Sequence, residues 1–315
     1  MRGFTLRCVE PRDLRLRLSA LVGFEAPRYP APAPSVIDER RRDGYTEQLV
    51  SYQSGDESVP ALLLIPGQPC GAGIVVHHQH HSQWHLGKSE VAGLQGDRWQ
   101  AFGPPLARLG AIVLAPDAIG FEDRRRGGHG TDARPSDPGD YFTTMCHQLI
   151  RGRPLMGTVL TDAATAHSAL AARPEVDPDR VGALGHSMGG ASALFHAALD
   201  TRVRFAVVSG AACTYRRRME RGTGIEATQV VPGILELCDL DDIAGLVAPR
   251  PLLLCSATED KYSHDAPAIA DAAAAVYRSA AAPEALSHAR FEGAHGLTEE
   301  RFSVIVDWLA SRLGA

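Results

Sequence analysis

The chain has 315 residues, which is enough for one large α/β domain, or two small ones, with a well-buried core. Hydrophobic residues make up 44% of it and charged residues 22%, as in an ordinary globular protein. Lys and Arg number 32 against 37 Asp and Glu, and the resulting net charge of −5 gives no electrostatic reason to bind nucleic acid or an anionic membrane.

The cysteines and the first residues bear on where the protein works. Six cysteines are scattered without a C-x-x-C pair, so no disulfide framework or metal-ligand spacing is indicated and a reducing compartment is expected. The first residues lack the apolar core and the small-residue cleavage site of a signal peptide. No apolar run approaches the length of a membrane span. We therefore expect a cytoplasmic protein with no membrane partner.

Residues 1–44 predict an arm ahead of the main domain. Apolar side chains at helical spacing predict a helix within residues 1–25, and the proline-rich stretch 27–34 predicts a stiff connector. The strand pattern begins at Tyr45, so we place the main domain at residues 45–315. We expect the arm to cover a pocket or a partner subunit, and the sequence leaves a homodimer open.

The rest of the chain alternates between short apolar segments and helical patterns. Strands are expected at residues 47–53, 61–65, 73–76, 111–115, 181–184, 205–209, 251–255 and 289–291. Helices are expected at residues 158–172, 190–199, 266–281 and 298–313. This order indicates an α/β fold with a mostly parallel sheet covered by helices on both faces. Two long irregular stretches, 119–155 and 211–247, are expected to form insertions over the carboxyl edge of the sheet and to wall a substrate pocket.

The most informative motif is G-H-S-M-G at residues 185–189, between the apolar strand and an alanine-rich helix. Gly-x-Ser-x-Gly at a strand-to-helix junction is typical of the nucleophile elbow of α/β-hydrolases. The turn is so tight that side chains at positions 185 and 189 would collide, which explains the two glycines. We expect the Ser187 hydroxyl to stand above the sheet, at the positive end of the following helix, as the nucleophile of a serine hydrolase.

An acidic residue is expected to follow the nucleophile along the chain, at the end of a later strand. The segment after the apolar strand 251–255 contains Asp260, which we choose as the orienting acid. Glu259 and Asp265 are the competing residues, and spacing alone does not exclude them.

The base is expected after the acid. His295 lies in a glycine-flanked loop just before the last helix, whereas His264 and His288 lie in less constrained settings. We expect His295 to take the proton of Ser187 during attack and to return it to the leaving group. Asp260 then holds the imidazole tautomer and stabilises the transient imidazolium.

An oxyanion hole requires backbone N–H donors. One is expected from Met188, directly after the nucleophile, and the other from the loop that follows the strand ending at His77. We favour Gln79 for the second donor, with His78 as the alternative. Each such donor is typically worth roughly 3 kcal/mol of transition-state stabilisation.

A run rich in histidine occupies residues 77–85. A linear run on a loop cannot direct many imidazoles to one centre, and no acidic or thiol partner shows ligand spacing, so we expect no metal. We expect the run to line the pocket entrance. His80, His81 and Trp84, together with His186 of the elbow, are therefore candidate substrate contacts.

Two arginine clusters lie in the long irregular stretches, at residues 124–126 and 216–218. The simpler interpretation is a solvated loop surface. The alternative is recognition of an anionic substrate group by Arg217 or Arg218, and we take Arg217 as the candidate substrate-binding residue.

Four further segments carry a family resemblance: G-K-S-E-V-A-G-L at 87–94, R-P-E-V-D-P-D-R-V at 173–181, V-P-G-I at 231–234 and A-P-R-P-L-L at 248–253. With the elbow, Asp260 and His295, the chain resembles the dienelactone hydrolase and acetyl-xylan-esterase-like branch of the α/β-hydrolases over residues 60–310. The resemblance implies an α/β-hydrolase fold and a carboxylic-ester hydrolase without a cofactor. One departure is the strand before the oxyanion loop, which in this branch usually leads into His-Gly and further glycines but here leads into the histidine-rich run.

The favoured function is hydrolysis of a small to medium ester or lactone through a Ser187 acyl-enzyme. A second hypothesis uses the same three residues to pass the acyl group to an alcohol or amine, as an acyltransferase or cyclase of a biosynthetic pathway. A third hypothesis is a non-catalytic binding protein on a hydrolase scaffold, although a binding protein has no need of a strained elbow. The expected partner is a small-molecule ester or acyl substrate.

Overall fold

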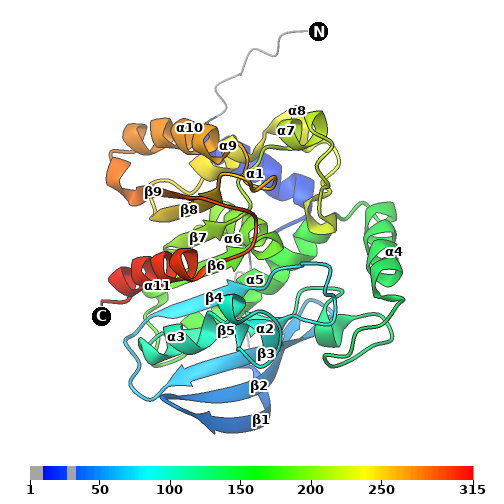
Figure 1. Ribbon diagram of the computed structural model, residues 1–315, viewed down its shortest axis with the longest axis vertical. Helices are drawn as coiled ribbons and strands as arrows, with labels where there is room; N and C mark the ends of the chain where they lie inside the picture. The colour runs from blue at the N-terminus through cyan, green and yellow to red at the C-terminus, as the bar shows by residue number, and fades with distance from the viewer. Residues whose placement is uncertain (1–9, 27–32, 315) are drawn as a thin grey trace.

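The computed structural model describes residues 10–26 and 33–314 (Figure 1). In this part of the chain, nine strands form one sheet in the order β1-β2-β3-β5-β4-β6-β7-β8-β9. The strands are β1 (Ser35–Arg42), β2 (Tyr45–Ser54), β3 (Glu57–Pro66), β4 (Gly73–His77), β5 (Ile112–Pro116), β6 (Val181–His186), β7 (Ala206–Ser209), β8 (Leu252–Ala257) and β9 (Leu286–Phe291). The pairs β1–β2, β2–β3 and β3–β5 are antiparallel. All the following pairs in this order, from β5–β4 to β8–β9, are parallel. The predicted mostly parallel sheet is confirmed.

Helices cover the sheet on both faces (Figure 1). They are α1 (Pro11–Val22), α2 (Lys88–Val91), α3 (Gly103–Arg108), α4 (Asp137–Ile150), α5 (Leu155–Ala171), α6 (Met188–Leu199), α7 (Tyr215–Glu220), α8 (Ile234–Leu237), α9 (Leu240–Gly245), α10 (Ala266–Ser279) and α11 (Glu299–Leu313). Among the described residues, none of these helices has the length and apolar character needed to cross a bilayer.

The strand β8 shows why the central strands are mainly apolar. Leu252 and Leu254 pack into the cluster that contains α1, α6 and α10, whereas Leu253 and Cys255 pack into the cluster that contains α3 and α11. Successive side chains of a strand point to opposite faces, so a strand buried on both faces favours a continuous apolar run rather than an alternating pattern.

The N-terminal arm packs on the chain's own helices. Leu14, Leu18 and Val22 of α1 are buried in the same cluster as α6 and α9. Arg15 extends this contact, because its Nε donates to the carbonyl of Ala198 at 2.8 Å and its Nη2 to that of Leu246 at 2.7 Å. These carbonyls lie at the C-terminal ends of α6 and α9, where a cation is favourable.

The segment before Tyr45 contains a strand that the sequence analysis did not predict. β1 pairs antiparallel with β2, and nearly all of its residues are exposed, so its S-V-I-D-E-R-R-R sequence lacks the apolar alternation of a half-buried strand. Residues 27–32 of the predicted connector lie outside the described residues. The domain boundary between residues 44 and 45 stays a prediction.

The two stretches predicted to be irregular contain helices. Residues 119–155 include α4, whose first turn holds a proline, a residue that suits this position but also marks loops. Residues 211–247 include α7, α8 and α9, which are only four to six residues long and too short to show a helical period.

The docking of α1 predicts a difference between two leucines of the same helix. Leu18 is fully buried, whereas Leu16 is 63% exposed. Leu18→Ala is expected to lower the free energy of unfolding by about 2–5 kcal/mol, because it leaves a cavity in the core. Leu16→Ala is the matched control and is expected to change it by less than about 0.5 kcal/mol. Urea denaturation of both variants tests this, and equal effects would contradict the packing of α1.

Candidate active site

Ser187 lies in a strained backbone turn between β6 and α6. Its φ of 58° and ψ of −121° fall in a backbone region that residues other than glycine rarely adopt, at a cost of about 1–3 kcal/mol. A Cβ at Gly185 would lie 2.1 Å from the carbonyl oxygen of Gly189, and a Cβ at Gly189 would lie 2.1 Å from that of His77. The structure therefore agrees with the steric reason predicted for the two glycines.

The three residues selected from the sequence lie in one hydrogen-bonded chain. The Nδ1 atom of His295 is 2.9 Å from Oδ1 of Asp260, and its Nε2 atom is 2.8 Å from Oγ of Ser187. An ionised carboxylate only accepts hydrogen bonds, so Nδ1 carries the proton and Nε2 of the neutral imidazole accepts from the serine hydroxyl. The arrangement can take a proton from Ser187 and hold the resulting imidazolium beside a negative charge.

Asp260 is buried but is held in its ionised form. Burial by itself raises the pKa of this carboxyl, but the hydrogen bond and charge of His295, the Ser263 hydroxyl at 2.6 Å and the Tyr262 N–H at 2.9 Å outweigh it and lower the pKa. The competing acids lie elsewhere: Glu259 is exposed, and Asp265 accepts from the hydroxyl of Thr214 at 2.6 Å.

The loop that carries His295 is held by a buried arginine of α11. Arg301 donates to the carbonyl of His295 and to that of Ala294, at 3.1 Å each, and is fully buried. The sequence analysis did not single out this residue, because an arginine at the start of a helix gives no signal of burial. It fixes the backbone from which the imidazole projects.

His186 packs against the imidazole of His295. The two ring centroids are 4.9 Å apart, and Nδ1 of His186 is 2.9 Å from the hydroxyl oxygen of Ser209. The residue is 1% exposed, and burial lowers the pKa of its imidazole well below the usual value. The structure thus places His186 behind the base, outside the cavity that Ser187 faces, where its predicted substrate contact is not available.

The candidate oxyanion donors flank Ser187 in different elements. Met188 begins α6, and the N–H of a first helical residue has no acceptor within its own helix. The side chain of Gln79 donates to Oε1 of Glu90 at 3.1 Å, and Nε2 of His78 accepts from the N–H of Ala118 at 3.0 Å. Both side chains therefore hold the loop after β4 in place. The choice between the backbone N–H of Gln79 and that of His78 stays a prediction.

The Ser187 hydroxyl faces a cavity of about 750 Å³. His80, His81 and Trp84 line it, and further walls come from α4 and from residues 224–229, within the two long stretches predicted to wall a pocket. The cavity also includes Arg218 but not Arg217. Arg217 is partly exposed and pairs instead with Glu220 at 3.3 Å.

The histidine-rich run does not converge on one centre. The imidazole of His77 is 3.4 Å from that of His196, the imidazole of His78 contacts the backbone of Gln79 and Ala118, and the ring of His80 meets Trp84 edge-on at 4.8 Å. Burial lowers the pKa of His77 to about 3 and that of His78 to about 4. These two imidazoles are therefore neutral parts of the core.

A cluster of carboxylates beside β5 is filled by a lysine. Asp117, Glu122 and Asp123 come close enough to share a cation, and Nζ of Lys88 donates to them at 2.7, 2.6 and 2.6 Å. Burial alone lowers the pKa of Lys88, but the carboxylates outweigh it and raise the pKa. Burial and the charge of Glu122 raise the pKa of Asp117 to about 7. In the sequence, the segment 87–94 carries only the family resemblance and gives no sign of this network.

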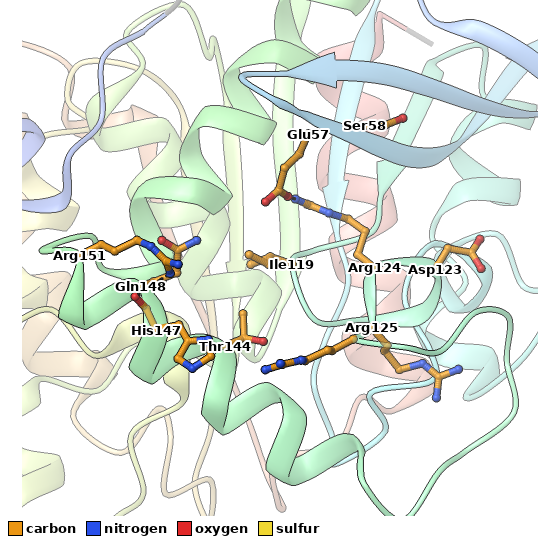
Figure 2. Close-up of a pocket in the computed structure, with 11 residues that line it drawn as sticks. Glu57, Ser58, Ile119, Asp123, Arg124, Arg125, Thr144, His147, Gln148 and Arg151 are labelled. Atoms are coloured by element: carbon orange, nitrogen blue, oxygen red, sulfur yellow. Dashed lines mark hydrogen bonds and ion pairs between the residues drawn. The ribbon is translucent and has the colours of Figure 1, made fainter.

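A second cavity, of about 480 Å³, lies beside α4 away from Ser187 (Figure 2). Arg124 reaches into it and pairs with Glu57 at 2.5 Å and with Asp162 at 2.6 Å, and Arg125 pairs with Asp137 at 2.6 Å. The expectation that cluster 124–126 is a solvated surface is wrong for these two side chains, which are 6% and 2% exposed. Their charges are neutralised within the fold, and this cavity has no paired nucleophile and base.

The chain is similar to known proteins in sequence and in fold. A family model described as acetyl xylan esterase matches residues 112–231. The Bacillus subtilis (strain 168) protein named "Putative hydrolase YtaP" is 30% identical over 258 residues, which cover 79% of this chain and 81% of that protein. The solved structure of a candidate acetyl xylan esterase from Bacteroides fragilis NCTC 9343 superposes with a TM-score of 0.75 at 17% identity, covering 96% of this chain and 86% of the other. A glucuronoyl esterase from Solibacter usitatus superposes with a TM-score of 0.65 at 16% identity, covering 96% and 92%.

The contact at Gly189 predicts a steric effect on the elbow. Gly189→Ala places a methyl group against the His77 carbonyl and is expected to lower the free energy of unfolding by about 1–3 kcal/mol. Gly296→Ala is the control, since a Cβ there meets no atom within 4 Å, and it is expected to change stability by less than about 0.5 kcal/mol. Thermal and urea denaturation measure both, and a neutral Gly189→Ala would contradict the close approach.

The buried lysine predicts a second, pH-dependent effect. Lys88→Met leaves the carboxylates without their counter-charge and is expected to cost about 3–5 kcal/mol of stability at pH 7. Lys88 itself stays protonated in the folded and the unfolded state over this pH range, because its folded pKa is raised above an ordinary value that already lies far above neutral. In the variant, the carboxylates have lost their counter-charge and take up more protons in the folded state than those of the wild type as the pH falls. The loss of stability caused by Lys88→Met is therefore expected to shrink between about pH 7 and about pH 5.

The control for this test is Lys261→Met, which removes an exposed lysine and is expected to change stability by less than about 0.5 kcal/mol. Urea denaturation of the wild type and both variants across this pH range gives the comparison. A loss of unfolding free energy in Lys88→Met that grows on acidification would contradict the role of Lys88 as the counter-charge of the carboxylates.

Proposed function

We propose that this chain cleaves its ester through an acyl-enzyme on Ser187. The chain belongs to the acetyl-xylan-esterase-like branch of the α/β-hydrolase superfamily and is a carboxylic-ester hydrolase. The observation that carries the proposal is the hydrogen-bonded order of Asp260, His295 and Ser187, at 2.9 and 2.8 Å. A serine hydroxyl is a weak nucleophile unless a base takes its proton, and a base needs a third group to orient it.

The first half of the proposed reaction forms the acyl-enzyme. Oγ of Ser187 attacks the carbonyl carbon of the ester while its proton passes to Nε2 of His295. The carbonyl oxygen becomes negatively charged and is stabilised by the N–H of Met188 and by that of Gln79, with His78 as the alternative. His295 then gives the proton to the alcohol oxygen as the bond between carbon and this oxygen breaks, and the alcohol leaves.

The second half releases the acid. Water attacks the acyl carbon, His295 takes a proton from it, and the proton returns to Oγ of Ser187 when the acyl bond breaks. Asp260 balances the positive charge of the imidazolium in both halves. The side chain of His295 is 21% exposed, which gives water access to the base and supports hydrolysis over transfer of the acyl group to another acceptor.

We propose that the substrate is a small molecule bound in the 750 Å³ cavity, where His80, His81 and Trp84 contact it. This volume is within the range of ordinary small-molecule sites. The acyltransferase or cyclase hypothesis uses the same residues, and no contact in the described residues favours it. The cytoplasmic location and the homodimer stay predictions from the sequence.

The proposed mechanism predicts opposite results for two neighbouring acids, Asp260 and Glu259. Asp260→Asn is expected to lower kcat for p-nitrophenyl acetate by about 10³–10⁴-fold, because it removes the group that sets the tautomer of His295. Glu259→Gln, the exposed neighbour, is expected to leave kcat within about threefold. Ser187→Ala and His295→Ala are expected to lose turnover to a similar or greater extent than Asp260→Asn.

Mass spectrometry after treatment with a fluorophosphonate completes the test. One adduct on Ser187, absent from His295→Ala, is the expected result, because the reagent needs an activated serine. An adduct on another residue, or full turnover by Asp260→Asn, would contradict the assigned roles.

A further inference from the structure

Among the described residues, one guanidinium in the Ser187 cavity has no negatively charged partner. Arg218 of α7 is 2% exposed and lines the cavity. Its Nη1 donates to the neutral amide oxygen of Gln229 at 2.8 Å, and its buried Nε has no hydrogen-bond partner. Within residues 10–26 and 33–314, no carboxylate oxygen lies within 4.0 Å of its nitrogens.

This isolation is unusual for a buried charge. A charged group that leaves water needs a counter-charge or a full set of hydrogen bonds. Arg124 and Arg125 are buried against carboxylates at 2.6 Å or less, and Arg301 donates to two backbone carbonyls. Arg218 has one neutral acceptor for a cation with five N–H groups.

The surroundings of Arg218 make this end of the cavity positive. The guanidinium carbon lies 5.8 Å from the ring centroid of Tyr262, and Nζ of Lys261 lies 5.0 Å from the same centroid. The ring of Tyr262 in turn meets that of His295 at 4.8 Å. Two cations thus flank an aromatic ring that touches the proposed base.

Glu226, the acidic residue that lines the cavity, does not neutralise these two cations. One carboxylate oxygen of Glu226 accepts from the hydroxyl of Tyr141, and the other accepts from the N–H and the hydroxyl of Thr228. These three donors occupy both carboxylate oxygens of Glu226, and within the described residues no ion pair joins Glu226 to Arg218. The unneutralised charge therefore faces whatever enters the cavity.

We propose that Arg218 binds a carboxylate of the substrate, so that the substrate is an ester that carries a free carboxylate besides its scissile bond. This inference rests on the proposed function, because the same cavity must hold the reacting ester. A carboxylate supplies both the negative charge and the planar pair of acceptor oxygens that match a guanidinium edge. Of the two arginines considered from the sequence, the cavity geometry points to Arg218, whereas Arg217 lies outside the cavity.

Matched ester pairs test the inference on the wild type without any variant. One pair, meta-acetoxybenzoate and meta-acetoxybenzamide, differs by a carboxylate on the alcohol part. The other pair, the p-nitrophenyl esters of glutaric acid and of its monoamide, differs by a carboxylate on the acyl part. We expect kcat/KM to be about 10- to 100-fold higher for the carboxylate member of at least one pair, after subtraction of spontaneous hydrolysis.

Two substitutions then assign the preference to a residue. Arg218→Gln is expected to reduce the preference, measured as the ratio of kcat/KM within each pair, to about onefold. Arg217→Gln, the adjacent arginine outside the cavity, is expected to keep the full preference. A purely structural effect of Arg218→Gln would lower both members of a pair equally and would overturn the inference.

The outcomes separate this inference from the function on which it rests. If the wild type hydrolyses the neutral members and a fluorophosphonate labels Ser187, but neither pair shows a preference for the carboxylate, the proposed function stands and the role of Arg218 is wrong. If no ester of either pair is hydrolysed and Ser187 is not labelled, the proposed function is wrong, and this inference, which rests on it, is wrong as well.

Discussion

The left-handed backbone of Ser187 is the constraint on which the site depends. The turn must carry the chain from β6 into α6 within one residue while the Ser187 hydroxyl stays above the sheet. The strain is held by the sheet on one side, where the Ser187 N–H donates to the Ser209 carbonyl at 2.8 Å, and by the helix on the other. Gly185 and Gly189 have no side chain because backbone atoms occupy that space. A small set of steric contacts thus determines where a nucleophile can lie.

Buried charges position the segments around this turn. Arg301 holds the loop of His295 through two backbone carbonyls, and Lys88 ties the loop after β4 to residues 117–123 through three carboxylates. Such networks contribute little net stability compared with apolar packing, but breaking one partner is costly, so they favour a single geometry. Within the described residues, Arg218 differs from Lys88 in having no carboxylate partner, and from Arg301 in donating to one neutral acceptor instead of two. It also lines the cavity that Ser187 faces, which is why we propose a ligand-binding role for this arginine alone.

The sequence was sufficient for features that follow from short-range rules. The elbow could be predicted from two glycines spaced around a serine, and Asp260 and His295 from chain order and from strand and loop context. Features that depend on tertiary contacts could not. The polar strand β1 carries no apolar alternation, and Arg301 and Lys88 look like surface residues in the sequence. His186 and Arg217 do not line the cavity that their positions suggested. Sequence adjacency to the site was not enough to place them in it.

Cleavage of the ester through a covalent intermediate on Ser187 is the step on which the proposed mechanism depends. Acid quenching of the enzyme within milliseconds of mixing with p-nitrophenyl butyrate, followed by intact and peptide mass spectrometry, tests this step most directly. We expect a butyryl group on the peptide that contains Ser187, formed and lost at rates consistent with turnover. Steady hydrolysis without any acyl group on this peptide, under conditions in which the release of acid limits the rate, would contradict the covalent mechanism.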